Sequence, residues 1–136
     1  MIHVIDNAYI YIRPEGVFDA ATLRRIAEGL QEIERERSLR LSDVSAVTEL
    51  RFEFTDFADY AKQRSYPAGD FQCRTAFYVT DNVKFGYARM CQTLIESPRQ
   101  EIRIFRDLDE AARWLGISLE PLVRRGFLPR RSGISG

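Results

Sequence analysis

The sequence predicts an α/β fold: a mixed sheet of about five strands, about four helices and a short helical extension at the carboxyl end. Residues 73–115 read as strand, helix, strand, helix, and the same alternation runs through the first half of the chain. Two short apolar runs near the amino terminus are separated by turn residues. Repeated strand-helix alternation is typical of a sheet with helices packed against it. We therefore expect one antiparallel amino-terminal strand beside strands that are largely parallel.

The first elements are a hairpin and a long helix. Residues 2–5 and 9–13 are strand-like, and Asp6-Asn7 between them is typical of a hairpin turn. Asp19 is a suitable cap for a helix that we expect to extend to about Arg37, because apolar residues recur there at helical spacing.

The middle of the chain continues the alternation. Residues 39–44 form the next predicted strand, and a helix follows to about Arg64. Thr55 is placed to cap that helix, a role that contributes roughly 1 kcal/mol and needs no further explanation.

The second half contains the clearest pattern. Residues 73–80 are a short apolar and β-branched run, and Asn82 is expected to cap the helix that follows. A strand at residues 101–106 precedes Asp107, which starts a helix in the manner of a capping box, and Gly116 suits the left-handed turn that ends it. The predicted apolar face of the helix after Asn82 comprises Val83, Tyr87, Met90, Cys91, Leu94 and Ile95.

Composition limits the classes of function. A chain of 136 residues suits one domain, and we place it at residues 1–117, followed by a basic extension at 118–136. Lys plus Arg equals Asp plus Glu, 20 against 20, so no global field attracts nucleic acid. The amino terminus lacks a signal-peptide pattern and no segment reaches the length of a membrane span, so the expected compartment is the cytoplasm.

Several short segments resemble the STAS domains of anti-sigma-factor antagonists, and more closely their SpoIIAA-like branch, which is related in fold to CRAL-TRIO lipid-transfer domains. The segments are Asp43-Val44-Ser45 at a strand end, Tyr87-Ala-Arg-Met90 in a helix, and Ile104-Phe-Arg-Asp-Leu-Asp-Glu-Ala111 with Trp114-Leu115 near the close of the domain. The resemblance covers about residues 9–116. It implies a regulatory module that acts through protein contacts.

The resemblance also implies a phosphorylation switch. In signalling STAS proteins a Ser or Thr at the start of the second helix accepts phosphate, which changes binding to a kinase-like partner. The candidates here are Thr55 and Ser45. This chain departs from the family, since it lacks the paired serines and the glycine of the usual switch motif. We expect helix capping by Thr55 and turn chemistry at Ser45.

Catalytic and metal-binding patterns are scarce. The single histidine, His3, lies near the terminus, which argues against a histidine-based triad or a histidine metal site. Cys73 and Cys91 fall on a predicted strand and on an apolar helix face, as expected of buried reduced thiols. We expect no cofactor and no metal. An enzyme remains the weakest alternative, with Asp43, Tyr78 and Arg89 as its candidate residues.

Two surfaces are candidates for binding. Phe57 and Tyr60 share a helix face with Arg64, and Phe85 lies one turn before Arg89, so aromatic rings beside arginines suggest a partner or ligand surface. Asp43 at a strand end belongs to the same set. The competing interpretation is that these rings are core.

The extension is the second candidate surface. Ser118 is expected to cap a short helix that Gly126 ends, and we expect residues 119–128 to dock on a neighbouring subunit or another protein. The docking residues are Leu119, Leu122, Arg124, Arg125 and Phe127.

Three functions therefore remain open from the sequence. We favour a non-catalytic binding or regulatory module whose partner is another protein or a second copy of the chain. The alternative is a carrier of a lipid or small apolar ligand, which requires an internal cavity. An enzyme is third.

Overall fold

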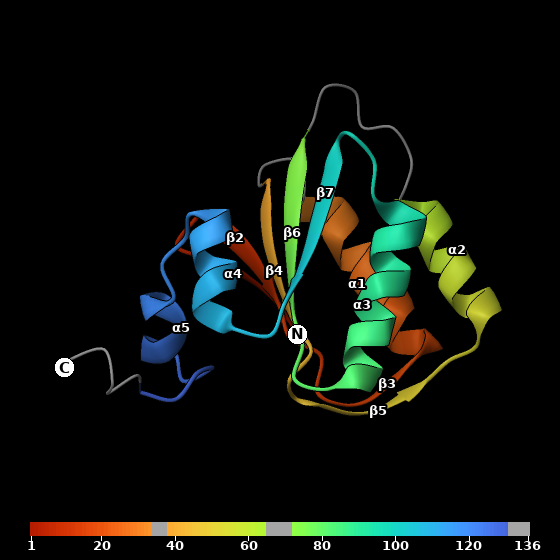
Figure 1. Ribbon diagram of the computed structural model, residues 1–136, viewed down its shortest axis with the longest axis horizontal. Coiled ribbons are helices and arrows are strands. Elements are labelled where there is room, and N and C mark those ends of the chain that lie inside the picture. Colours follow the sequence, from red (N-terminus) through yellow and green to blue (C-terminus); the bar gives the residue numbers. More distant parts are fainter. Residues whose placement is uncertain (34–37, 65–71, 131–136) are drawn as a thin grey trace.

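The computed structural model describes residues 1–33, 38–64 and 72–130, apart from the side chains of Glu32, Gln63 and Arg64. Strands and helices alternate as predicted (Figure 1). The strands are β1 (Ile2–Ile5), β2 (Tyr9–Ile12), β3 (Gly16–Asp19), β4 (Leu39–Asp43), β5 (Val47–Arg51), β6 (Cys73–Tyr78) and β7 (Gln100–Phe105). The helices are α1 (Ala20–Ile33), α2 (Phe54–Arg64), α3 (Asn82–Ile95), α4 (Leu108–Leu115) and α5 (Glu120–Arg124). The expected continuation of α1 to Arg37 lies outside the described residues.

The main sheet has five strands in the order β1-β2-β4-β6-β7. β1 is antiparallel to β2, and every other neighbouring pair is parallel, which confirms the predicted mixed sheet. Because β2, β4, β6 and β7 run in one direction, their carboxyl ends meet at the same edge. This carboxyl edge lies at the lower end of the sheet in Figure 1.

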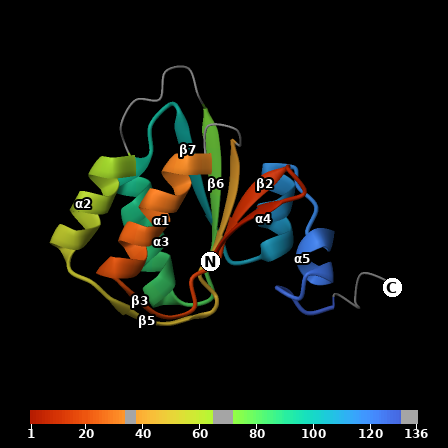
Figure 2. The ribbon, with the colours of Figure 1, turned by 180° about the vertical axis from the view of Figure 1, so that it is seen from behind.

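The helices cover both faces of the sheet. α1, α2 and α3 lie on one side, and α4 and α5 lie on the other, as Figure 2 shows from behind. Two cores result. The first lies beneath α1, α2 and α3 and includes Phe18, Leu23, Phe57, Phe77 and Tyr87. The second lies beneath α4 and α5 and includes Tyr9, Tyr11, Leu41, Leu108 and Leu122.

A second, two-stranded sheet was not predicted. β3 and β5 pair in parallel near the carboxyl edge, with Phe18 opposite Leu50. The pairing brings Phe18 into the first core, where it is 1% exposed. Gly16 opens β3 with a φ of 69°, a left-handed conformation that favours glycine.

Three helix caps are as predicted. The carboxylate of Asp19 accepts a hydrogen bond from the Thr22 amide at 2.9 Å, which starts α1. The carboxylate of Asp107 accepts from the amides of Asp109 and Glu110 and starts α4. Gly116 ends α4 with a φ of 72°, the left-handed conformation expected of it.

Two other predicted caps were wrong by one or two residues. Asp81, not Asn82, caps α3, and its carboxylate accepts from the Lys84 amide at 2.9 Å. Thr55 lies inside the first turn of α2. That turn is closed by Asp56, whose carboxylate accepts from the Glu53 amide at 3.0 Å in the reciprocal half of a capping box.

The apolar face of α3 is narrower than predicted. Tyr87, Cys91 and Ile95 are buried with Ala88, but Val83 is 69% exposed and Leu94 is 37% exposed. Cys73 and Cys91 are both buried and form no disulfide with each other, as predicted.

The outer edge of β7 is closed by side chains of α3. Gln92 donates to the Ile102 carbonyl at 2.8 Å, and Glu96 accepts from the Ile102 amide at 3.1 Å. The outward main-chain groups of Gln100 bond to Ser97 in the preceding turn. These contacts replace the hydrogen bonds that a further strand would make, which is one way in which proteins block edge-to-edge association.

Candidate functional site

The carboxyl edge of the sheet brings together residues that are far apart in sequence. Arg13 directly follows β2, Ser45 follows β4 after one residue, and Arg106 directly follows β7. α2, α3 and α4 begin at this edge, because each helix follows the carboxyl end of a strand. Binding sites in open α/β sheets commonly lie outside the carboxyl ends of the strands.

Asp43 lies at this edge but is fully buried. Its two carboxylate oxygens accept hydrogen bonds from the Tyr11 hydroxyl at 2.5 Å and from the Ser45 amide at 2.9 Å. Burial, together with the negative charge of Asp43, raises the pKa of Tyr11 well above its usual value. The prediction that Asp43 forms part of a partner or ligand surface is therefore wrong, since the carboxylate holds the turn after β4 and has no contact with solvent.

A solvent-open cleft of about 460 Å³ lies beside this buried pair, and we call it the edge cleft. Its polar side is formed by Arg13, Arg106, Asp107 and Asp109, together with Ser45. The guanidinium of Arg106 donates to the Asn82 side chain at 2.7 Å and lies 5.1 Å from the centre of the Phe85 ring. The carboxylate of Asp107 is engaged by the amides of α4, as described above.

The apolar lining of the edge cleft comes largely from the carboxyl-terminal extension. It consists of Leu108 at the start of α4 and of Phe127, Leu128 and Pro129. The Phe127 ring contacts the Tyr11 ring, with their centres 5.3 Å apart, so the extension packs over the residue that binds Asp43.

The extension packs on its own domain. Leu119 and Leu122 are 8% and 0% exposed and belong to the second core. The Tyr9 hydroxyl donates to the Ser118 carbonyl at 2.9 Å. The predicted docking of Leu119, Leu122 and Phe127 onto another protein is therefore corrected, because these side chains cover the α4 face of the sheet.

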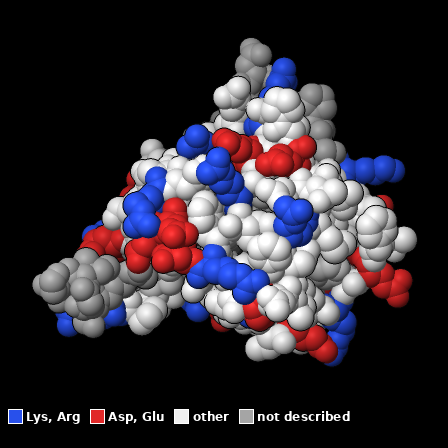
Figure 3. Space-filling model, in the orientation of Figure 1, with Lys and Arg blue, Asp and Glu red and all other residues white. Residues whose placement is uncertain are grey.

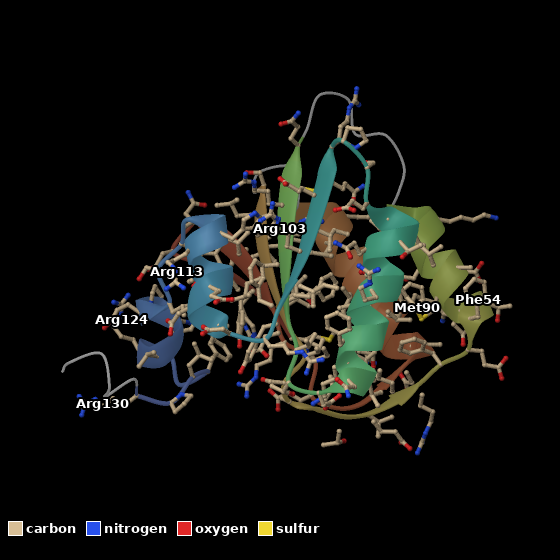
Figure 4. All side chains as sticks on the ribbon, viewed as in Figure 1. Phe54, Met90, Arg103, Arg113, Arg124 and Arg130 are labelled. Carbon is tan, nitrogen blue, oxygen red and sulfur yellow. The ribbon has the colours of Figure 1, made fainter. Side chains whose placement is uncertain are left out.

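Arg124 and Arg125, two of the arginines of the extension, stay accessible. Arg124, labelled on α5 in Figure 4, forms an exposed ion pair with Asp6 of the turn between β1 and β2 at 3.5 Å. Arg125 is exposed, and its guanidinium lies 5.6 Å from the centre of the Phe127 ring. These two positions remain candidates for contact with a partner.

The predicted aromatic surface is mostly core. Phe57 is fully buried, and its ring centre lies 5.7 Å from that of Tyr87, so its assignment to a partner surface is wrong. Tyr60 and Phe85 are half-buried and pack against the same core. The side chain of Arg64 lies outside the described part of the chain.

The three candidate catalytic residues are not brought together. Asp43 and Tyr78 are neighbours across β4 and β6, and Tyr78 lines the edge cleft. Arg89 is exposed on α3, where its guanidinium donates to Gln92 at 2.9 Å. The described residues contain no group of His, Cys, Asp and Glu that could hold a metal ion.

Apolar side chains are exposed around the carboxyl edge. Phe54 in the first turn of α2 is 64% exposed and lies on the outer side of that helix in Figure 4. Val83 in the first turn of α3 is 69% exposed, and Val17 on β3 is 41% exposed. The space-filling view in Figure 3 shows acidic and basic side chains interspersed over one face, with no field of a single sign.

An inner cavity lies between the sheet and α1, α2 and α3. Arg40, Ser42 and Thr75 reach it from the strands, and Tyr60 lines it from α2. The volume of the cavity is about 30 Å³, which is room for a water molecule or two. Carriage of a lipid in this cavity would require the helices to move apart. Among the described helices, none has the length and apolar character needed to cross a membrane.

Among the solved structures that resemble this one are the following two. The first is an uncharacterized protein of the DUF3478 family with a SpoIIAA-like fold from Shewanella loihica PV-4, with a TM-score of 0.56 and 16% identity over 85% of this chain and 90% of that one. The second is the anti-sigma factor antagonist SpoIIAA in its unphosphorylated form, with a TM-score of 0.55 and 11% identity over 86% of this chain and 98% of that one. The chain has a SpoIIAA-like fold. No protein-family model and no curated protein matches the sequence.

The SpoIIAA-like fold confirms the architecture that the sequence resemblance implied. Sequence reasoning missed Arg13, Arg106 and the role of Tyr11 at the edge. One signal was present: Arg13 and Arg106 each directly follow a strand, and the carboxyl ends of parallel strands converge. The contact between Tyr11 and the extension had no comparable signal.

Proposed function

We propose that this chain is a regulatory binding module that acts through a protein partner at the carboxyl edge of its sheet. The SpoIIAA-like fold supports this function, since one structure with that fold is an anti-sigma factor antagonist. The observation that carries the proposal is the exposure of Val17, Phe54 and Val83 on three elements at one end of the molecule. Exposed apolar side chains gathered at one end are typical of a protein-binding surface.

The edge also offers a means of regulation. Thr55 is exposed in the first turn of α2, next to Phe54. A phosphate there is favoured by the unpaired amides of the helix terminus and adds charge beside an apolar contact residue. We propose Thr55 as the phosphorylation input. Ser45 is half-buried in the edge cleft and is the less accessible of the two hydroxyls. Phosphopeptide mass spectrometry on protein from its native cell tests this input, and phosphate on neither residue would rule it out.

The partner surface is tested with matched substitutions on α3. Val83→Gln removes an exposed apolar side chain at the carboxyl edge, and Leu94→Gln removes one near the other end of the same helix. Phe54→Gln is combined with Val83→Gln so that the double variant loses two exposed apolar side chains and binds a partner still more weakly. Proteins captured from native cells by each variant are quantified by mass spectrometry, and each candidate partner is then purified and titrated by calorimetry.

The expected result is a protein that binds the wild type and Leu94→Gln but binds Phe54→Gln/Val83→Gln at least tenfold more weakly, on the order expected for loss of two exposed apolar contacts. Retention of every captured protein by the double variant would refute the proposed surface. Capture of no protein that binds after purification would refute the proposed function. Sedimentation of the same variants reports whether the partner is a second copy of the chain.

A further inference from the structure

Arg13 is the residue of the edge cleft that the fold leaves without an evident role. It is half-buried, and its Nε is shielded from solvent with no hydrogen-bond acceptor among the described residues. A shielded donor on a charged group costs more than an ordinary lost hydrogen bond, so such groups in native structures are generally explained by a bound water, ion or ligand. The shielded Nε does not face the open cleft, but Arg13 is a half-exposed cleft-lining residue, so the rest of its guanidinium is the part that an acceptor in the cleft would contact.

The cleft is large enough for a small molecule. Its volume of about 460 Å³ falls within the range of roughly 300 to 1,000 Å³ that is typical of small-molecule sites. The sites of such ligands combine apolar walls with a few polar groups that fix orientation. Here Leu108, Phe127 and Leu128 supply apolar lining, and Arg13 lines the same cleft.

The apolar side is held in place. The Phe127 ring lies against the rings of Tyr11 and His3, with centres 5.3 Å and 4.6 Å apart. The amide of Phe127 donates to the Leu122 carbonyl at 2.9 Å, which fixes the start of the segment after α5. The apolar lining at Phe127 is therefore built into the fold of the extension.

The charges of the cleft decide the class of ligand. Arg13 and Arg106 are balanced by Asp107 and Asp109, so the cleft does not present the positive field that a polyanion requires. Arg106 is already bound to Asn82, and Asp107 is bound to the amides of its own helix. A single anionic group directed at Arg13 fits this balance.

We propose that the edge cleft binds a small amphiphilic anion, whose carboxylate or phosphate group pairs with Arg13 and whose apolar body packs on Phe127 and Leu128. Arginine suits both groups, because its planar donors match either oxyanion. The site is independent of the proposed partner surface. It uses the α4 side of the edge, whereas Phe54 and Val83 lie at the starts of α2 and α3.

The test is a titration of the isotope-labelled full chain, followed by two-dimensional NMR of its amides. The probes are phenyl phosphate and benzoate, with benzyl alcohol as the neutral analogue and inorganic phosphate as the anion without an apolar body. We expect both aromatic anions to shift the amides of Arg13, Ser45, Tyr78 and Phe127, and to bind more tightly than either control probe. A preference between the two anions identifies the group that the site accepts.

The variants separate the two halves of the site. Arg13→Gln should weaken binding of the preferred aromatic anion by about tenfold to a hundredfold, as expected for loss of a charged hydrogen-bond partner. Phe127→Ala should weaken binding of the aromatic anion and leave binding of inorganic phosphate unchanged. Arg89→Gln, which removes an exposed arginine on α3, is the control and should bind as the wild type does. Circular dichroism verifies that each variant is folded.

Four results would overturn the proposal: no shifts in the cleft with either aromatic anion at millimolar concentration, shifts confined to other regions, benzyl alcohol binding as tightly as the anions, or unchanged binding by folded Arg13→Gln.

Discussion

Removing the hydrogen bond between Tyr11 and Asp43 tests how much this bond stabilises the second core. Asp43 is fully buried, and the Tyr11 hydroxyl is one of its two described donors. Tyr11→Phe removes only the hydroxyl and leaves the ring that packs on Phe127. A hydrogen bond to a charged group contributes about 1.5 to 3 kcal/mol, and a buried acceptor that is left short of a donor adds to that cost, so we expect a loss of roughly 2 to 4 kcal/mol.

Tyr9→Phe is the matched control. It lies on the same strand, and its hydroxyl donates to a neutral acceptor, the Ser118 carbonyl. The expected loss for this control is only about 0.5 to 1.5 kcal/mol. Urea unfolding, followed by the fluorescence of the single tryptophan, measures each variant.

A double-mutant cycle isolates the pair. Asp43→Asn removes the buried charge, so Tyr11→Phe should cost less in that background, with a coupling energy of about 1 to 2 kcal/mol. Equal losses for Tyr11→Phe and Tyr9→Phe, or a coupling energy near zero, would show that Asp43 does not depend on the Tyr11 hydroxyl.

Three further predictions concern single features of the fold. Burial, with neighbouring positive charges, lowers the pKa of His3 below 6.5. The unfolded chain therefore binds more protons than the folded chain as the pH falls below 6.5, so the free energy of unfolding should decrease there. This decrease should be smaller in His3→Gln than in the wild type. An NMR titration of this single histidine that gave 6.5 or higher would contradict it. Gly116→Ala should destabilise the protein by about 1 to 2 kcal/mol, because Gly116 has a left-handed φ. Gly86→Ala should stabilise the protein by about 0.5 to 1 kcal/mol, because Gly86 lies in the interior of α3 with open space where a Cβ would lie. Melting temperatures that changed in the same direction for both variants would refute this contrast. The double variant Gln92→Ala/Glu96→Ala leaves the main-chain amide and carbonyl of Ile102 on the outer edge of β7 without these partners. Self-association measured by sedimentation should therefore increase. Sedimentation identical to that of the wild type would show that other contacts protect this edge.

The main sheet and most helices could be predicted because their signals are local. The hairpin depends on the turn between two adjacent runs, and α4 depends on Asp107 and Gly116 at its ends. β3 and β5 had no such signal. Gly16–Asp19 is only four residues long, and its partner is a distant parallel strand of largely exposed residues. Pairing of this kind depends on the completed fold, which short sequence patterns do not encode.

The site was less predictable than the fold. Helical spacing places Phe57 on a face with Tyr60, but it does not tell which face meets the sheet, and Phe57 is in fact fully buried. The pattern of the extension correctly indicated a short helix with an apolar side. It did not identify what that side covers, because a second subunit and the chain's own α4 face would bury Leu122 equally well.

The contact between the extension and β2 has a consequence for synthesis in the cell. A chain leaves the ribosome from its amino terminus, so α1, α2 and α3 can pack on their face of the sheet while later residues are still being added. The other face carries Tyr9 and Tyr11 and stays uncovered until α4, Leu122 and Phe127 have emerged. The nascent protein therefore passes through a form with one bare apolar face, and this half-covered sheet is the species that a chaperone would meet.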